Sequence, residues 1–256
     1  MDDGRVALGT VAAEYVHRWF PRRRALAGFS AGLSVRLDEA YCREVAEYYE
    51  RAPRLAWDAG LRWRYGRLAV ESARQYRAVV GAGLRVLPWA GPSRPYRSSA
   101  DLIEHVRTAG ALYVQLTSHA HGPAGQAGFH PMRAKSGVVE GGVELCGNDL
   151  FRVVHDVFGH VLLGSSFGPR GEFLATYGHL HLYSADLLPV LFTEQIGQIC
   201  WFYFGPHLVD GSGRLPRPGD PGYVSPAERP YPVQKVFAFP RHFLDRFLAS
   251  FPGGPR

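Results

Sequence analysis

Residues 148–160 read Asn148-Asp149-Leu150-Phe151-Arg152-Val153-Val154-His155-Asp156-Val157-Phe158-Gly159-His160. Apolar residues recur in this stretch at helical spacing, which predicts a largely buried helix. The helix carries two histidines, His155 and His160, five positions apart. Imidazole is the commonest protein ligand for a transition metal. The stretch therefore predicts a helical fold built around a metal site.

A carboxylate that could complete this site is Glu194, which lies in a second apolar run at residues 187–204. A charged group in a densely apolar helix needs a partner or a metal. Two histidines and one carboxylate, with the remaining positions open, form the facial triad of non-heme Fe(II) oxygenases. Glu172 is the reserve candidate for third ligand, on a helix that looks more amphipathic.

The spacing of the two histidines is unusual for a helix. Five positions turn an α-helix by roughly 500°, which leaves the side chains about 140° apart. Both can reach one metal only if the helix is locally distorted, and Gly159 gives room for that. Asp156, the predicted catalytic residue, follows the first histidine. It either orients water or ligand beside the metal, or faces solvent.

The hexapeptide His155-Asp156-Val157-Phe158-Gly159-His160 resembles the His-Glu-Leu-Leu-Gly-His signature of the pterin-dependent aromatic amino acid hydroxylases. Both read histidine, acid, two apolar residues, glycine, histidine. The segment Thr193-Glu194-Gln195-Ile196-Gly197-Gln198 is similar to the Phe-Thr-Val-Glu-Phe-Gly of that family. The resemblance covers residues 148–206. It implies that His155, His160 and Glu194 bind iron, and that the fold is a mainly α (α+β) catalytic domain with a few short strands.

From the metal site and the resemblance we expect an Fe(II)-dependent monooxygenase that hydroxylates an aromatic amino acid or a related small molecule with O₂. A tetrahydropterin or another donor would be the reductant. The alternative is a zinc-dependent hydrolase that uses the same site with Asp156 as general base. A non-catalytic domain that binds metal or nucleic acid is the third possibility.

Candidates for contact with the substrate lie on both sides of the histidines. Arg170 and Arg133 could clamp an anionic group, because a guanidinium matches a carboxylate with two hydrogen bonds. Trp201, in an aromatic block at residues 201–204, either forms a wall of the pocket or packs in the core. Three histidines of a long irregular segment, residues 117–147, could line the pocket mouth: His119, His121 and His130.

The length of 256 residues predicts a single catalytic domain, with a helical part at about residues 1–89 and a metal-binding core at about 112–206. Helical patterns outnumber strand patterns. We expect helices at residues 9–18, 38–50, 61–81, 98–108, 148–163, 169–184, 187–204 and 240–249, and strands at 84–89, 112–116 and 235–239.

The chain has a net charge of +6, but its basic residues are nearly all arginines spread along the sequence, with no nucleic-acid-binding motif. We expect small-molecule partners, a substrate and O₂, rather than nucleic acid. No apolar run approaches the roughly 18 residues of a membrane span, and the first residues lack a signal-peptide pattern. A cytoplasmic protein is therefore expected.

Overall fold

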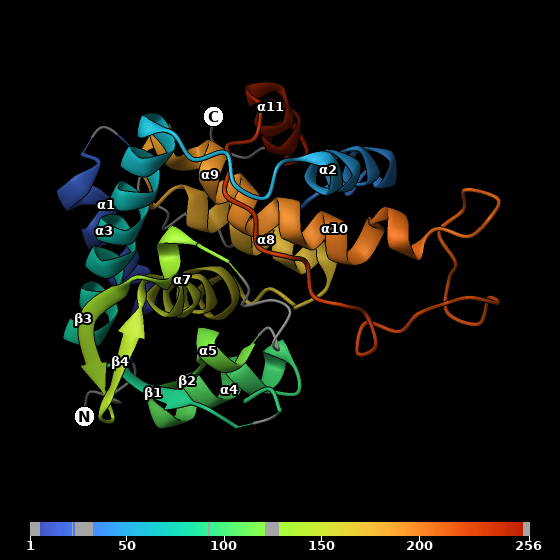
Figure 1. Cartoon of the computed structure of the whole chain (residues 1–256). Coiled ribbons are helices and arrows are strands. Elements are labelled where there is room, and N and C mark those ends of the chain that lie inside the picture. Colours follow the sequence, from blue (N-terminus) through green and yellow to red (C-terminus); the bar gives the residue numbers. More distant parts are fainter. Residues whose placement is uncertain (1–5, 22, 24–32, 92, 121–127, 253–256) are drawn as a thin grey trace.

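The structure is a computed structural model that describes residues 6–21, 23, 33–91, 93–120 and 128–252 (Figure 1). These residues are mostly helical and include a few short strands, which confirms the expected mainly α class. The helices are α1 (Leu8–Trp19), α2 (Glu39–Arg51), α3 (Ala59–Gly81), α4 (Ser99–Ala109), α5 (Thr117–Ala120), α7 (Gly147–His155), α8 (Pro169–Leu180), α9 (Leu188–Phe192), α10 (Gln198–Phe204) and α11 (Arg241–Ala249). Short 3₁₀ turns are η2 (Pro131–Arg133), η4 (Ala185–Leu187) and η6 (Pro206–Leu208), and π-helical turns are η3 (Asp156–Val161) and η5 (Thr193–Gly197).

Side-chain caps fix where the first long helices begin. The carboxylate of Asp38 accepts hydrogen bonds from the backbone N–H groups of Ala40 and Tyr41 at the start of α2. Asp58 caps α3 and Ser98 caps α4 in the same way. Each cap satisfies backbone donors that have no partner inside the helix, and this stabilises the helix start.

Two small sheets lie beside the helices at one end of the molecule (Figure 1). Strands β1 (Arg85–Trp89) and β2 (Ala111–Gln115) pair in parallel, and α4 connects them. Strands β3 (Lys135–Glu140) and β4 (Val143–Cys146) form an antiparallel hairpin. Sequence reasoning missed this hairpin and expected residues 117–147 to be irregular. Its turn is Gly141-Gly142, with φ of 52° and 79°, a pair of positive values that glycine adopts without strain.

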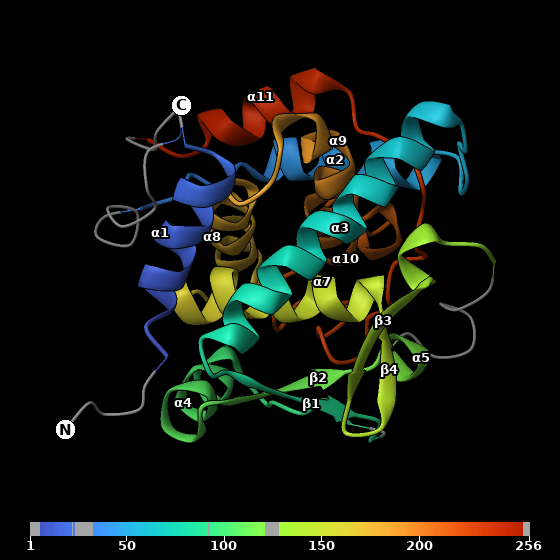
Figure 2. The ribbon, with the colours of Figure 1, turned by 90° about the vertical axis from the view of Figure 1, so that its left-hand side faces the viewer.

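The helices pack around one large apolar core. Helix α3 crosses in front of α7, and α2 and α11 lie at the end of the molecule opposite the two sheets (Figure 2). Aromatic rings fill much of the centre, including fully buried Tyr65, Tyr183, Phe158, Phe173 and Phe192. Burial of such rings is the main force that holds the helices together. Residues 235–239, expected as a strand, contribute only one bridge, between Leu55 and Val236.

None of the helices formed by the described residues combines the length and the apolar character that a bilayer span requires.

Candidate metal centre

A π-helical turn brings His155 and His160 together. His155 ends α7, and η3 continues the same helix with wider hydrogen bonds: the N–H of Leu162 donates to the C=O of Val157, five residues back. In a π-helix the hydrogen bonds join residues five apart, so such residues lie on nearly the same side of the helix, unlike in an α-helix. The two imidazole ring centroids are 5.0 Å apart. The distortion that the i, i+5 spacing needs is therefore present in the helix itself.

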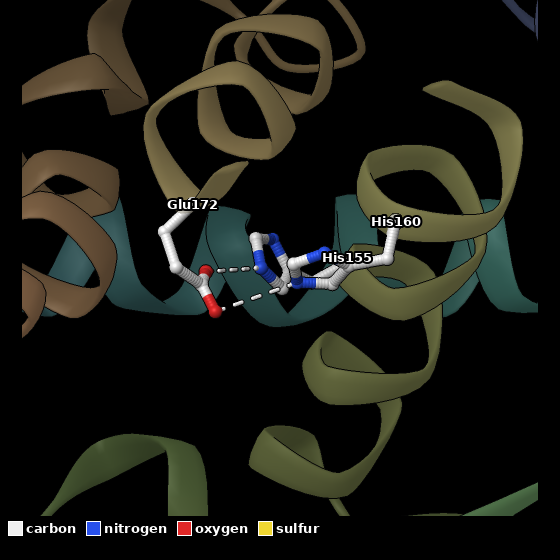
Figure 3. Close-up of side chains that lie close together, drawn as sticks. All are labelled: His155, His160 and Glu172. Atoms are coloured by element: carbon white, nitrogen blue, oxygen red, sulfur yellow. Dashed lines mark hydrogen bonds and ion pairs between the residues drawn. The ribbon is translucent and has the colours of Figure 1, made fainter. Parts of the chain in front are cut away.

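Close packing at Gly159 sets the neighbouring helix against this turn. A Cβ added at Gly159 would lie 2.8 Å from the Cβ of Ala175 on α8, which is closer than real Cβ atoms approach. Only glycine fits without a shift of the backbone. The approach places Glu172, one turn before Ala175 on α8, directly beside the two imidazoles (Figure 3).

The carboxylate of Glu172 faces both histidines. Its Oε2 lies 3.4 Å from Nε2 of His155, and its Oε1 lies 3.6 Å from Nε2 of His160 (Figure 3). One ligand atom from each of the three residues falls within 4.8 Å of the others, which is the spacing of a group that could hold a metal ion. The donor set of two imidazoles and one carboxylate fits a divalent transition metal such as Fe(II) or Zn(II).

The protonation of His160 and that of Glu172 depend on each other. Burial disfavours the charged form of His160, but Glu172 and Asp156 outweigh burial and raise the pKa of His160 to about 9. Burial also opposes the charge of Glu172, and the two histidines outweigh it and lower the pKa of Glu172 to about 2. The carboxylates of Glu172 and Asp156 therefore favour a positive charge at this place, either a proton on His160 or a metal cation that replaces that proton.

The structure places Glu172, and not Glu194, beside the two histidines. The Glu194 carboxylate accepts hydrogen bonds from the Tyr65 hydroxyl at 2.6 Å, His130 Nε2 at 3.2 Å and Gln198 Nε2 at 3.3 Å. These three donors satisfy a buried charge without a metal. Glu194 therefore has the partners that its burial requires. Gln198 lies one helical turn further on, whereas Tyr65 and His130 come from distant parts of the sequence, which local apolar density does not reveal.

Hydrogen bonds behind the cluster orient His160. Its Nδ1 lies 3.2 Å from the C=O of Ser165 and 3.0 Å from Oγ of Ser165, whose hydroxyl donates to the C=O of Gly159. A carbonyl oxygen only accepts, so Nδ1 of His160 carries a hydrogen and donates it. In the neutral ring this leaves the lone pair on Nε2, directed at Glu172, as metal-ligating histidines normally have it.

Asp156 follows His155 directly in the chain and lies beside the cluster. It begins η3 and lines both cavities that adjoin the histidines. Burial raises the pKa of Asp156, and the neighbouring charges of His160, His155 and Arg152 partly offset that rise. A carboxyl group in this position can accept or release a proton beside the cluster. Its predicted role, to orient water or a ligand beside the metal, stays a prediction.

Two adjoining cavities open onto the cluster. The smaller, about 250 Å³, contains His155, His160, Glu172, Glu194 and Gln195 in its wall. The other, about 270 Å³, shares Asp156 and Glu172 with it and has six aromatic rings in its wall: Tyr96, Tyr113, Phe167, Phe202, Tyr203 and Tyr231. Such a slot accommodates a small flat ligand. Sequence reasoning missed the tyrosines of residues 96 and 113, because they come from β2 and the loop before α4, outside the resemblance.

The three residues predicted to contact substrate lie elsewhere. The Arg170 guanidinium donates to the C=O of Val35, and that of Arg133 to the side chain of Gln234. Trp201 stacks on His207, with ring centroids 3.9 Å apart. None of the three is among the residues that line these two cavities. Within the aromatic block of residues 201–204, Phe202 and Tyr203 face the slot instead, because neighbouring residues of a helix point in different directions.

The histidines expected at the pocket mouth also separate. His130 is buried against Glu194, whereas His119 is exposed and bonds Ser118. His121 lies outside the described residues.

Comparisons of the chain with protein-family models, with curated proteins and with solved structures gave no match. The resemblance to the pterin-dependent hydroxylases therefore rests on residues 148–206 of the sequence and stays a prediction.

Proposed function

We propose that the protein is an Fe(II)-dependent monooxygenase that hydroxylates a small aromatic molecule with O₂. The observation that carries the proposal is the convergence of His155, His160 and Glu172 beside an aromatic slot. Two imidazoles and one carboxylate on one side of an ion leave the other positions open, as in non-heme Fe(II) oxygenases. The hexapeptide at residues 155–160 supports the same reaction class.

In this proposal His155 and His160 hold the ion through Nε2, and Glu172 supplies the negative charge. Fe(II) bound there supplies the activation of O₂ for insertion of one oxygen atom. The rings of Phe167, Phe202 and Tyr203 hold a flat substrate against the cluster and keep water away from it. Asp156 is placed to move a proton at the entrance.

A tetrahydropterin is the reductant that the hexapeptide favours, and a flat heterocycle suits the aromatic slot. An aromatic amino acid is the substrate class that follows from the same resemblance. Arg152 and Arg94 bring positive charge to the slot and suit a substrate with an anionic group.

The first test is the metal content of protein purified without chelators. We expect about one iron per chain, and loss of iron in His160→Ala and Glu172→Gln. The matched control is Glu194→Gln, which changes a carboxylate of the same cavity that is already satisfied by hydrogen bonds and should keep the iron. Stoichiometric zinc in place of iron would turn the proposal to hydrolysis, and no metal after reconstitution would remove it.

The second test is O₂ uptake by the iron-loaded protein with tetrahydropterin and aromatic amino acids as probes. Uptake that requires both probes supports the full proposal. Uptake with another reductant removes only the pterin. A loaded protein that takes up no O₂ with any reductant would contradict the monooxygenase assignment even if the iron site is intact.

A further inference from the structure

A chain of buried hydrogen bonds runs from helix α3 to the metal-ligand candidate His155. Its members in order are the C=O of Leu182, Gln75, His179, Gln195 and His155. Gln75 and His179 are fully buried, and Gln195 is 5% exposed. Because water does not reach these groups, each hydrogen bond constrains the next one.

Gln75, at the end far from His155, determines which groups donate and which accept in this series of hydrogen bonds. The Gln75 amide lies 3.1 Å from the C=O of Leu182, which only accepts, so the Gln75 amide nitrogen points there. The amide oxygen of Gln75 then faces Nε2 of His179 at 3.2 Å. His179 must donate from Nε2. The His179 ring is fully buried, and its two nitrogens face the amides of Gln75 and Gln195 and not a carboxylate that would balance a positive charge. The ring is therefore neutral, and its Nδ1 is an acceptor.

Gln195 passes this constraint to His155. Its Nε2 lies 3.0 Å from Nδ1 of His179 and 2.8 Å from Nδ1 of His155. One amide nitrogen carries two hydrogens, so Gln195 donates one to each ring. The Nδ1 of His155 is then an acceptor, and its hydrogen is on Nε2, directed at Glu172. Among the described residues the amide oxygen of Gln195 has no hydrogen-bond partner, although it is buried.

The two histidines of the cluster therefore differ. The Nδ1 of His160 donates to Ser165, which leaves its Nε2 able to bind a metal once the ring is neutral. The Nε2 of His155 carries a hydrogen in the observed arrangement and therefore cannot bind a metal. A metal on Nε2 of His155 requires the hydrogen on Nδ1, and Nδ1 then needs an acceptor. The unpartnered oxygen of Gln195 becomes that acceptor if the amide turns by half a revolution.

We propose that Gln195 is a positioning residue that sets the tautomer of His155: in the observed amide orientation it holds the hydrogen on Nε2, and after a half-turn its oxygen holds the hydrogen on Nδ1 and readies the ring for metal. His179 opposes the half-turn, because its Nδ1 lone pair would then face the amide oxygen. The metal step rests on the proposed metal centre, whereas the tautomer of the metal-free protein does not.

The experiment is nitrogen NMR of metal-free protein with ¹⁵N-labelled histidine and glutamine. We expect His155 to carry its hydrogen on Nε2 in the wild type. In Gln195→Met, which removes both donors at similar side-chain size, the fraction of His155 with its hydrogen on Nδ1 should rise, although Glu172 still favours the hydrogen on Nε2. The matched control is Gln198→Met, three residues further on, which bonds Glu194 and neither histidine. His155 with its hydrogen on Nδ1 in the metal-free wild type would overturn the proposal. A tautomer unchanged in Gln195→Met would also overturn it.

The same sample then receives Zn(II), which is diamagnetic. We expect the hydrogen of His155 to move to Nδ1 and the side-chain amide signals of Gln195 to shift, with those of Gln198 unchanged. Gln195→Met should weaken Zn(II) binding by about tenfold, the lower end of the loss seen when an outer hydrogen-bond partner of a ligand is removed. Zn(II) bound at His155 with unshifted Gln195 signals would refute the half-turn. A protein that binds no Zn(II) would refute the metal centre and leave the tautomer result standing.

Discussion

Oε2 of Glu172 lies 3.4 Å from Nε2 of His155, although the two residues belong to different helices. The relationship depends on two local features of backbone. The π-helical turn η3 aligns His155 with His160, and the close approach at Gly159 places α8 against that turn. Neither feature alone would assemble the cluster.

The first prediction compares the contributions of Glu172 and Glu194 to metal binding. Glu172→Gln keeps the size of the side chain but removes the charge that faces both imidazoles. Loss of a direct ligand should weaken Co(II) binding by more than about a hundredfold, the upper end of what loss of an outer partner causes. Competition titration with a chromophoric chelator measures it. Glu194→Gln should bind Co(II) within a few-fold of wild type, and the reverse ranking of the two variants would restore Glu194 as the ligand.

The second prediction concerns the hydrogen bond from Tyr65 to Glu194. Tyr65→Phe removes a donor from a buried carboxylate and should lower the free energy of unfolding by about 1–3 kcal/mol. Urea unfolding of the metal-free protein measures the change. The matched control is Tyr76→Phe, whose hydroxyl bonds Glu140 at the same 2.6 Å, where the carboxylate is partly exposed. Equal losses in both variants would mean that the burial of Glu194 is not what makes its hydrogen bonds necessary.

The sequence predicted the main helices and the two histidines of the cluster, but it favoured Glu194 over Glu172 as the carboxylate beside them. Periodicity located the main helices because their buried faces repeat every turn. Periodicity could not reveal the π-helical turns, since a wider turn leaves the residue types of a helix unchanged. Glu172 was ranked below Glu194 because burial was judged from local apolar density. The position of Glu172 depends instead on how α8 packs against Gly159, a residue of another helix.

The third prediction is a loss of stability in mild acid caused by His181. Burial and the charge of Arg23 lower the pKa of His181 to about 4, against a usual value of about 6.5. A lowered histidine pKa means that the unfolded chain binds the proton first. The stabilising contribution is therefore complete above about pH 6.5 and is lost as the pH falls toward 4.

Between pH 7.5 and pH 5 this loss amounts to about 2 kcal/mol, because one pKa unit corresponds to about 1.4 kcal/mol. His181→Gln cannot take up the proton, so its free energy of unfolding should fall less steeply over the same interval. Urea titrations at several pH values measure both slopes. His242→Gln, which replaces an exposed histidine, serves as the control and should keep the wild-type slope. A slope in His181→Gln as steep as in the wild type would assign the acid sensitivity to other groups.

The fourth prediction tests the close approach that assembles the cluster. Gly159→Ala places a methyl group 2.8 Å from the Cβ of Ala175, so α8 must move away from η3. Overpacking of this kind costs about 1–3 kcal/mol of stability. It should also weaken Co(II) binding, because Glu172 moves with α8. Gly66→Ala on α3 is the control of opposite sign: nothing lies within 4 Å of the added Cβ. At this exposed position of α3, alanine should raise the free energy of unfolding by about 0.5–1 kcal/mol.

Removal of the opposing methyl group tests whether the clash itself is responsible. Ala175→Gly alone puts a flexible residue inside α8 and should cost about 0.5–1 kcal/mol. Combined with Gly159→Ala, it removes the 2.8 Å contact, although two backbone atoms of residue 175 stay 3.2 and 3.3 Å from the added Cβ. The double variant should therefore lose less stability than the sum of the two single losses, by at least about 0.5 kcal/mol, the size of coupling expected for residues in contact. Co(II) affinity should recover in parallel, because the distance between Glu172 and the histidines depends on the same contact. Strict additivity in both measurements would show that the helices approach each other for a reason other than the missing side chain at Gly159.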